Sequence, residues 1–313
     1  MFAPVCLFTY NRLWETQQTI EALKNNFLAQ KSDLIIFSDG PKNEQAEEQV
    51  LHVRNYVEGI SGFKSIKIIH SSENKGLANS IISGVTRVLQ EYGKVIVLED
   101  DIVTRPNFLD FINQALDYYC ENPKIRSING YSLKLKSASK EIYFQKRSFP
   151  WGWGTWKNRW SEDFFNKQHI KSQIENDKSL LKKFKNDCGD DISKMLLDSL
   201  NNVNNSWYVR WVYTHFLTDT FSAYPIHSFV ENIGYSDNGT HCRTINSYDS
   251  NIIESTNRIF EFIPFEYPDE EVKHDFLFYF SYWSKLMVRF QLLRSAGGRE
   301  KVLDEIKYKL KLA

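Results

Sequence analysis

Cysteines are few in this sequence, and none of their spacings suits a metal or a disulfide framework. The four cysteines are Cys6, Cys120, Cys188 and Cys242, and no two of them form a CxxC pair. Structural zinc sites need closely spaced cysteine pairs, and small secreted domains need a dense set of cysteines. The sequence therefore argues against both classes and favours reduced thiols in a cytosolic protein.

An excess of charge and a long apolar run are also missing. The 313 residues include 39 Lys and Arg and 39 Asp and Glu, so no overall field attracts nucleic acid or an anionic membrane. Spanning a membrane takes about 20 consecutive apolar residues, and no window reaches that length. The first residues lack the basic and apolar regions of a signal peptide. We therefore expect a cytoplasmic protein that binds its partners through local sites, with no nucleic acid among them.

The most informative stretch runs from Lys94 to Val103 and reads KVIVLEDDIV. Its unbroken β-branched run is typical of a strand buried on both faces of a parallel sheet. Glu99, Asp100 and Asp101 then stand at the carboxyl edge of the strand, where open α/β sheets bind ligands. Adjacent carboxylates repel one another unless they share a cation, and Mg²⁺ or Mn²⁺ prefers such oxygen ligands. A solvated acidic turn is the alternative, which the position directly after a buried strand disfavours.

The first hundred residues alternate between apolar runs and helical patterns. Strands are expected over 5–8, 34–37, 65–69 and 94–98, with helices between them. This order predicts βαβ units and an α/β fold with a mostly parallel sheet flanked by helices. Polar turns follow the first two strands, Thr9 to Arg12 and Ser38 to Pro41, so polar groups from several strand ends should meet in one crevice.

These turns carry a resemblance to a known family. Tyr-Asn-Arg, Ser-Asp-Gly, Asn-Lys-Gly-Leu before a helix and Leu-Glu-Asp-Asp resemble the nucleotide-sugar domain of GT-A fold glycosyltransferases. The sequence is similar to the Golgi N-acetylglucosaminyltransferase that initiates complex N-glycans, whose metal motif is also Glu-Asp-Asp, and to bacterial sugar transferases. The resemblance implies a nucleotide-sugar-binding half over 1–130, an acceptor-side half of the same GT-A domain over 131–245, and a C-terminal helical extension over 246–313.

The resemblance implies a role for each matching residue on the nucleotide side. Arg12 would meet the nucleotide or its phosphate, Asp39 would accept a hydrogen bond from uracil, and Lys75 and Gly76 would lie along the nucleoside. The chemistry agrees, since a carboxylate suits the imide N–H of uracil and a guanidinium suits phosphate. Taken singly, Asp39 could initiate a turn, Arg12 could be a surface cation, and Asn74 to Gly76 could be an ordinary loop.

Roles for the acids are implied in the same way. Asp100 would face the ribose, Asp101 would ligate Mn²⁺ or Mg²⁺, and Glu99 would lie near the donor sugar. A lone histidine such as His241 is more often structural. GT-A enzymes commonly bring a C-terminal histidine to the metal, however, so the resemblance implies His241 as a second ligand beside Asp101.

Four tryptophans lie between residues 151 and 160, with Gly152 and Gly154 among them. Aromatic faces pack well against sugars, and glycine lets a backbone approach closely. Gly152 and Trp153 match the glycine-tryptophan loop of the resembled family, which implies a place against the donor sugar or the acceptor. An aromatic core is the alternative, left open for Trp153 and preferred for Trp156 and Trp160.

The reaction implied is transfer of a hexose or N-acetylhexosamine from a UDP-sugar to a glycan or lipid-linked hydroxyl, with inversion. A carboxylate would deprotonate the acceptor. The resembled Golgi enzyme has an Asp beside a tryptophan, whereas here Asn205-Ser206-Trp207 offers no acid. The candidates for the base are Asp163, Asp191, Asp198 and Glu231.

The last residues form a basic helical pattern over Lys301 to Lys311, with Val302, Leu303 and Ile306 on one side. Docking on the core is the simpler interpretation, and peripheral contact with the inner face of the cell membrane is the alternative. Two other function classes stay open. A sugar nucleotidyltransferase needs a glycine-rich N-terminal loop, which Thr9 to Arg12 lacks. A carbohydrate-binding module would explain the tryptophans but not the acidic strand end.

Overall fold

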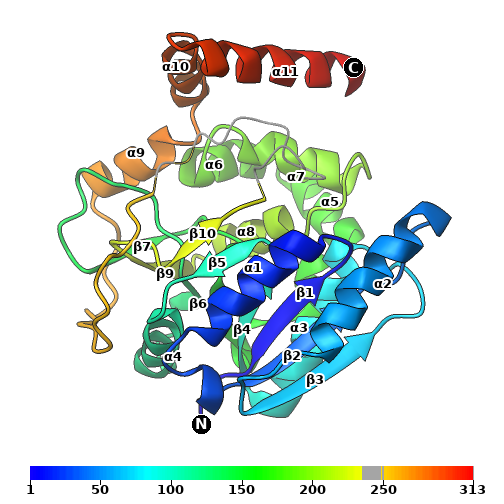
Figure 1. Ribbon diagram of the computed structural model, residues 1–313. Coiled ribbons are helices and arrows are strands. Elements are labelled where there is room, and N and C mark those ends of the chain that lie inside the picture. Colours follow the sequence, from blue (N-terminus) through cyan, green and yellow to red (C-terminus); the bar gives the residue numbers. More distant parts are fainter. Residues whose placement is uncertain (235–247, 249, 313) are drawn as a thin grey trace.

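An eight-stranded sheet forms the centre of the described part of the chain, residues 1–234, 248 and 250–312 of a computed structural model. The strand order is β3-β2-β1-β4-β8-β6-β9-β7, and β10 and β5 form a separate pair. The strands are β1 (Val5–Thr9), β2 (Asp33–Ser38), β3 (Ser65–His70), β4 (Lys94–Glu99), β5 (Ile102–Thr104), β6 (Ile125–Asn129), β7 (Ile142–Gln145), β8 (Trp153–Trp156), β9 (Phe221–Pro225) and β10 (Val230–Asn232). Figure 1 shows helices on both faces of this sheet.

The helices follow the strands in the order that βαβ units require. They are α1 (Leu13–Lys24), α2 (Glu44–Glu58), α3 (Leu77–Tyr92), α4 (Phe108–Tyr118), α5 (Lys167–Asn176), α6 (Ser179–Cys188), α7 (Ile192–Leu200), α8 (Trp207–Leu217), α9 (Glu270–Phe278), α10 (Tyr282–Leu292) and α11 (Ala296–Leu312). The strands β1, β2, β3 and β4 are parallel, β8 runs antiparallel between β4 and β6, and β6 is parallel to β9. The predicted α/β fold with a mostly parallel sheet is confirmed, and it is consistent with GT-A.

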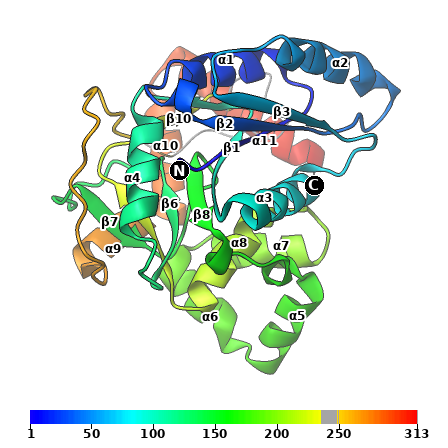
Figure 2. The same ribbon diagram turned by 90° about the horizontal axis from the view of Figure 1, so that it is seen from below.

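Two layers of helices cover the sheet. On one face α1, α2 and α4 bury Ile20, Val53 and Ile112, while on the other face α3 and α8 bury Val85 and Trp211. Figure 2 shows α1 and α2 on one side of β1 and β2, with α3 on the opposite side. The parallel strands therefore have both faces covered, as their apolar runs predict.

Glycine at position 84 brings α3 close to the sheet. A Cβ atom built at Gly84 would lie 2.7 Å from the ring of Phe8 and 3.2 Å from that of Phe37. The two rings stack with centroids 5.0 Å apart. The close approach of α3 to the sheet therefore requires glycine here, and it sets the position of the loop that precedes the helix.

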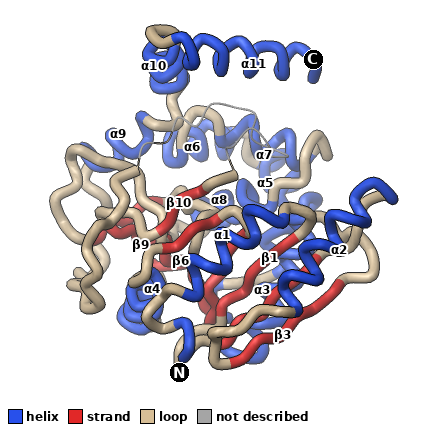
Figure 3. The backbone as a smooth tube through the Cα atoms, viewed as in Figure 1, coloured by secondary structure: helices blue, strands red, loops and turns tan. Residues whose placement is uncertain are grey.

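The remaining helices form a lobe beside the sheet. The helices α5, α6, α7 and α8 bury a separate apolar cluster that includes Phe184, Leu196 and Val212. These helices lie within residues 131–245, and the acceptor-side role that the resemblance implies for that half stays a prediction. Residues 260–267 form neither a helix nor a strand, as the loop colour in Figure 3 shows.

Candidate functional site

The carboxyl ends of β1, β2 and β4 open into one pocket of about 260 Å³. Its lining residues are Phe8, Thr9, Tyr10, Asn11, Arg12, Asp39, Lys42, Asn74, Gly76, Leu77, Ser80, Glu99 and Asp100. The structure thus brings together Arg12, Asp39, Gly76, Glu99 and Asp100, which the sequence marked in four separate motifs. Lys42 and Ser80 also line the pocket, although nothing in their local sequence distinguishes them from surface residues.

Asp39 joins the end of β2 to the loop before α3. Its Oδ1 accepts hydrogen bonds from the backbone N–H groups of Gly40 (3.0 Å) and Lys75 (2.9 Å). Its Oδ2 accepts from the N–H of Gly76 (2.9 Å) and the side-chain amide of Asn74 (3.3 Å). A carboxylate offers about four acceptor positions, so the chain itself occupies them. A hydrogen bond from uracil to Asp39 stays a prediction, and it requires one of these donors to move.

Gly76 gives the loop before α3 its shape. Its φ of +73° is a conformation that glycine adopts without strain. The helix begins at the next residue with no side-chain cap and no acid in its first turn. The unpaired N–H groups of this turn are therefore next to the pocket, where they favour an anion.

Arg12 lies against the two aspartates that follow β4. Its Nη2 donates to Asp100 Oδ1 and to Asp101 Oδ2 (3.0 Å), and its Nε lies 3.4 Å from Asp100 Oδ2. Burial lowers the pKa of Arg12, but the charges of Asp100 and Asp101 outweigh it and hold this pKa above its usual range. Arg12 is therefore the cation that these carboxylates share in this structure, and it is no free surface residue.

Burial also raises the pKa values of Glu99 and Asp100. Burial, reinforced by the charges of Asp101 and Asp100, raises the pKa of Glu99 to about 8, although a hydrogen bond from Trp207 lowers it. Burial raises the pKa of Asp100 to about 6 despite the charge of Arg12. At neutral pH the site holds a largely protonated Glu99, so it carries fewer negative charges than the sequence indicates.

Asp101 has an oxygen that no described residue satisfies. Its Oδ1 is buried and has no hydrogen-bond partner within residues 1–234, 248 and 250–312. On the other side, a Cβ atom at Gly234 would lie 2.1 Å from Asp101 Oδ2, so the chain after β10 closes over this carboxylate. A buried oxygen without a donor fits a metal ligand.

The metal site otherwise rests on few residues. Within residues 1–234, 248 and 250–312, no three His, Cys, Asp or Glu side chains converge as a metal cluster. His241, the predicted second ligand, lies outside the described residues. Magnesium-like ions are commonly held by one or two carboxylates together with the phosphates of a substrate, and Asp101 fits that arrangement.

The tryptophans of the central segment lie in the core. Trp153 is 1% exposed, and its ring lies 5.9, 5.4 and 5.9 Å from those of Trp160, Trp207 and Trp211. A Cβ atom at Gly152 would lie 3.0 Å from the side chain of Val230, so this glycine is packed as well. The aromatic-core alternative describes Trp153 here, and direct contact of Gly152 or Trp153 with a sugar stays a prediction.

Trp207 is the residue that sequence reasoning missed. It stacks on Trp153 and its side chain hydrogen-bonds to Glu99, so it links the aromatic cluster to the acidic strand end. Its position at the first turn of α8, directly after the N-cap Ser206, was visible as the place where the resembled enzyme carries an acid.

The structure gathers none of the four predicted bases, Asp163, Asp191, Asp198 and Glu231, in the lining of this pocket. Asp191 forms ion pairs with Arg147 (2.7 Å) and Lys285 (2.8 Å). Burial raises the pKa of Asp191, but these two cations outweigh it and hold the pKa below its usual range. Asp198 pairs with Lys194 (2.6 Å) on the surface of α7. Asp191 is therefore held by two cations, and its role as the base stays a prediction.

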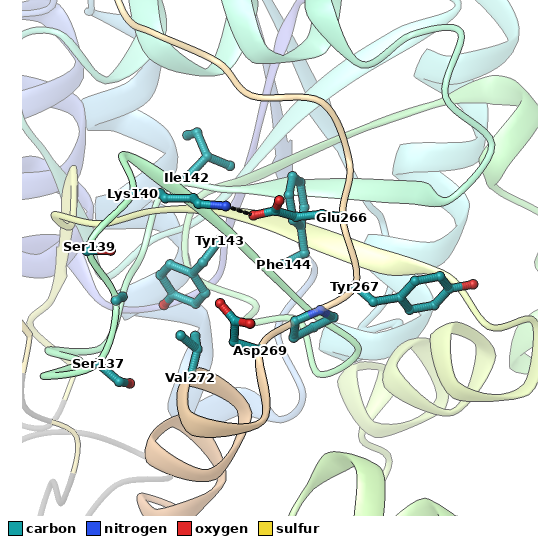
Figure 4. Close-up of a pocket in the computed structure, with 12 residues that line it drawn as sticks. Ser137, Ser139, Lys140, Ile142, Tyr143, Phe144, Glu266, Tyr267, Asp269 and Val272 are labelled. Atoms are coloured by element: carbon teal, nitrogen blue, oxygen red, sulfur yellow. Dashed lines mark hydrogen bonds and ion pairs between the residues drawn. The ribbon is translucent and has the colours of Figure 1, made fainter.

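A second hollow, of about 50 Å³, lies between residues 137–144 and 266–272. Figure 4 shows Lys140 and Glu266 paired across it, with Tyr143 and Asp269 nearby. The ion pair fastens the C-terminal segment to β7, and the hollow carries no grouping suited to nucleotide chemistry.

Comparison with protein families decides the class of the chain. Residues 5–173, which include β1 to β4 and the acidic strand end, match the family model described as Glycosyl transferase family 2. The chain belongs to glycosyl transferase family 2. A search of curated proteins finds no match.

Solved structures with a similar arrangement are nucleotide-sugar transferases. One is the mannosyltransferase PcManGT from Pyrobaculum calidifontis in complex with GDP-Man and Mn²⁺, with 9% identity over 50% of this chain and 44% of that one and a TM-score of 0.35. Another is S. aureus TarS 1–349, with 10% identity over 75% and 61% and a TM-score of 0.43. The chain spans less than two thirds of both. At these values the family 2 assignment rests on the family match alone, and similarity to the Golgi enzyme stays a prediction.

Proposed function

We propose that this family 2 glycosyltransferase is metal-dependent and moves a hexose or N-acetylhexosamine from a UDP-sugar to a hydroxyl of a glycan or lipid-linked acceptor, with inversion. The observation that supports the proposal is the Oδ1 of Asp101, which is buried, has no partner among the described residues and lies beside a pocket lined by Arg12, Asp39 and Asp100. A metal ligand, a phosphate-binding cation and a nucleoside-binding carboxylate would then stand at three adjacent strand ends.

Asp101 would hold the metal, with His241 as the predicted second ligand. Bound Mn²⁺ or Mg²⁺ would act as a Lewis acid on the departing diphosphate. Arg12 would exchange its two aspartates for phosphate oxygens, which suit the fork of a guanidinium. The protein would thus keep Asp100 and Asp101 neutralised before the donor binds and release Arg12 when it does.

The other pocket residues would bind the nucleoside and the sugar. Asp39 would accept a hydrogen bond from uracil once one of the loop N–H groups that it now binds has moved away. Lys75 and Gly76 would lie along the nucleoside. Asp100 would face the ribose. Glu99, at the end of β4, would lie near the donor sugar. Gly152 and Trp153 would support this side through the indole of Trp207.

The base stays a choice between acids outside the pocket. Asp198 carries a single surface ion pair and is the better candidate, since the two cations on Asp191 make that carboxylate a weak base. The tryptophans that suggested a carbohydrate-binding module weigh against it, because Trp153, Trp156 and Trp160 are buried and offer no exposed platform. A lipid-linked acceptor would place the enzyme in polysaccharide biosynthesis at the inner face of the cell membrane.

The test is a screen of UDP-sugars for hydrolysis of the donor, with Mn²⁺ and with a chelator. We expect turnover of one donor that the chelator removes and that Asp101→Ala abolishes. Asp117→Ala, at an exposed acid on α4, is the matched control and should keep the wild-type rate. Undiminished hydrolysis by Asp101→Ala, or in chelator, would overturn the metal-dependent mechanism.

A further inference from the structure

The last two helices form a hairpin that projects from the body. Figure 1 shows α10 and α11 at the top of the view, beyond α6 and α7. The guanidinium of Arg289 donates to Glu305 Oε2 at 2.8 Å and so links the two helices, and Val302 of α11 is buried in the hairpin. Lys285 pairs with Asp191 at 2.8 Å and anchors α10 to the body. We refer to residues 281–312 as the C-terminal hairpin.

The apolar side of α10 faces outward. It consists of Tyr282 (60% exposed), Trp283 (74%), Leu286 (46%), Met287 (48%), Phe290 (66%) and the adjoining Leu293 (40%). Their spacing places them on one side of a helix. The polar side carries Ser284, which is buried, with Lys285 and Arg289, which are paired. A surface helix normally turns its apolar side inward, so this arrangement indicates an interaction surface.

The charge of the hairpin differs from that of the rest of the chain. Residues 281–313 contain eight Lys and Arg and three Asp and Glu, a net +5, although the whole chain is neutral. The remaining 280 residues therefore carry a net −5. On α11, Lys301 is exposed and Lys307 is 71% exposed. Positive charge is thus concentrated where the exposed aromatic residues are.

We propose that the apolar side of α10 docks on an anionic membrane surface. Trp283 and Tyr282 are the residue types that prefer the depth of the lipid headgroups, and Leu286, Met287 and Phe290 would enter the boundary of the acyl chains. Basic residues near such a surface strengthen the attachment. A second copy meeting hairpin to hairpin would bring two +5 segments together, which like-charge repulsion opposes.

The sequence marked Lys301 to Lys311 of α11 as the membrane contact. Of the apolar residues there, Val302 is buried, whereas Leu303 (54%) and Ile306 (48%) are exposed. The larger group of exposed apolar residues belongs to α10, so this helix would carry most of the contact. None of the described helices has the length and apolar content to cross a bilayer, so the contact would lie in the interface. The inference does not depend on the donor or the metal and would stand if the proposed function failed.

The test is flotation of the full-length protein with vesicles of phosphatidylcholine alone and with added phosphatidylglycerol. We expect binding to the anionic vesicles, falling at least about tenfold for Trp283→Ser/Phe290→Ser because two exposed anchors are lost. Leu51→Ser, at an apolar residue of α2 that is 55% exposed, is the matched control and should float like the wild type. Since all three side chains are exposed, thermal unfolding should be unchanged.

A second variant tests the charge. Lys301→Glu/Lys307→Glu should weaken binding to anionic vesicles by about fivefold or more per residue and leave oligomeric state unchanged. Equal flotation of wild type and Trp283→Ser/Phe290→Ser would overturn the proposal. The proposal would also fail if the wild type bound to no vesicle. A dimer in solution that Trp283→Ser/Phe290→Ser dissociates would then identify the apolar side of α10 as a contact between two copies of the chain.

Discussion

Arg12 pairs with carboxylates that a divalent metal would bind, and its guanidinium is also the group that a diphosphate would bind. It pairs with Asp100 and Asp101, whose charges hold the pKa of Arg12 high, while Asp101 Oδ1 has no partner in the part of the chain that the structure describes. A guanidinium that neutralises metal ligands weakens the binding of metal alone. The same guanidinium would strengthen the binding of a phosphorylated donor, because charge-assisted hydrogen bonds are stronger than neutral ones.

Arg12→Gln should therefore change two affinities in opposite directions. We expect Mn²⁺ to bind more tightly without nucleotide, and UDP to bind at least about tenfold more weakly, since a lost charge-assisted hydrogen bond costs about 1.5–3 kcal/mol. Electron paramagnetic resonance measures the affinity for Mn²⁺, and calorimetry measures the affinity for UDP. Arg87→Gln, on the exposed side of α3, is the control. A parallel loss of both affinities would contradict the exchange of partners.

Asp191 offers a test that separates a base from a structural anion. Asp191→Asn should lower the free energy of unfolding by about 3–5 kcal/mol, because it leaves Arg147 buried and without its carboxylate. Unfolding in urea measures this. Asp190→Asn, at a neighbour in a more exposed ion pair with Lys185, should cost less than about 1 kcal/mol. Unchanged stability together with lost turnover would instead identify Asp191 as the base.

At the scale of elements, the packing of α3 on β1 and β2 sets the nucleotide side of the pocket. Gly84→Ala should destabilise the protein by about 1–3 kcal/mol, because the added methyl group would overlap the rings of Phe8 and Phe37, and overpacking outweighs the gain in helix propensity. Ser83→Ala, on the exposed side of the same helix, should be neutral within about 0.5 kcal/mol. Thermal unfolding of the two variants gives the comparison, and equal stabilities would show that the sheet yields to the methyl group.

The parallel strands were predictable from the sequence and β8 was not. Apolar β-branched runs such as Val95 to Leu98 indicate burial on both faces, whatever the neighbouring strands are. In β8 the two small residues Gly154 and Thr155 stand between Trp153 and Trp156, a pattern that favours a loop as much as a strand. Its partners β4 and β6 lie elsewhere in the chain, so only tertiary structure decides its place.

Several residues of the candidate site could each be predicted from the strand end that carries them. Arg12, Asp39 and Asp100 follow buried strands, and parallel strands bring their carboxyl ends to one edge. Interactions between these ends were not predictable, because they depend on side-chain directions across the sheet. The four donors on Asp39, the bridge formed by Arg12 and the indole of Trp207 on Glu99 belong to this second kind.

At the scale of the whole molecule, acid should destabilise the fold through His215. Burial lowers the pKa of this histidine to about 3, and its neutral ring contacts the carbonyl of Trp211 and the hydroxyl of Ser127. In the unfolded chain the imidazole of His215 titrates near pH 6.5, so below that pH the unfolded state binds a proton that the folded state does not bind. The contribution is complete above pH 6.5 and is lost as the pH falls toward 3, at about 1.4 kcal/mol per pH unit.

Unfolding in urea at pH 7 and pH 5 measures this dependence. Wild type should lose about 2 kcal/mol more between the two values than His215→Gln, which has no titrating ring. Glu99 and Asp100 titrate identically in both proteins, so the difference isolates the histidine. Parallel pH profiles for the two proteins would contradict the assignment.

The position of β8 fixes an order of assembly. As the chain leaves the ribosome, β6 emerges before β8, yet β6 is separated from β4 by β8 and joins the sheet through it. Until residue 156 is synthesised, β8 cannot pair with β4. One edge of β4 then stays unpaired, and β6 lacks the strand that links it to β4. A nascent chain paused in this interval would expose an unpaired, apolar strand edge to its neighbours, which is the condition under which chaperones are needed.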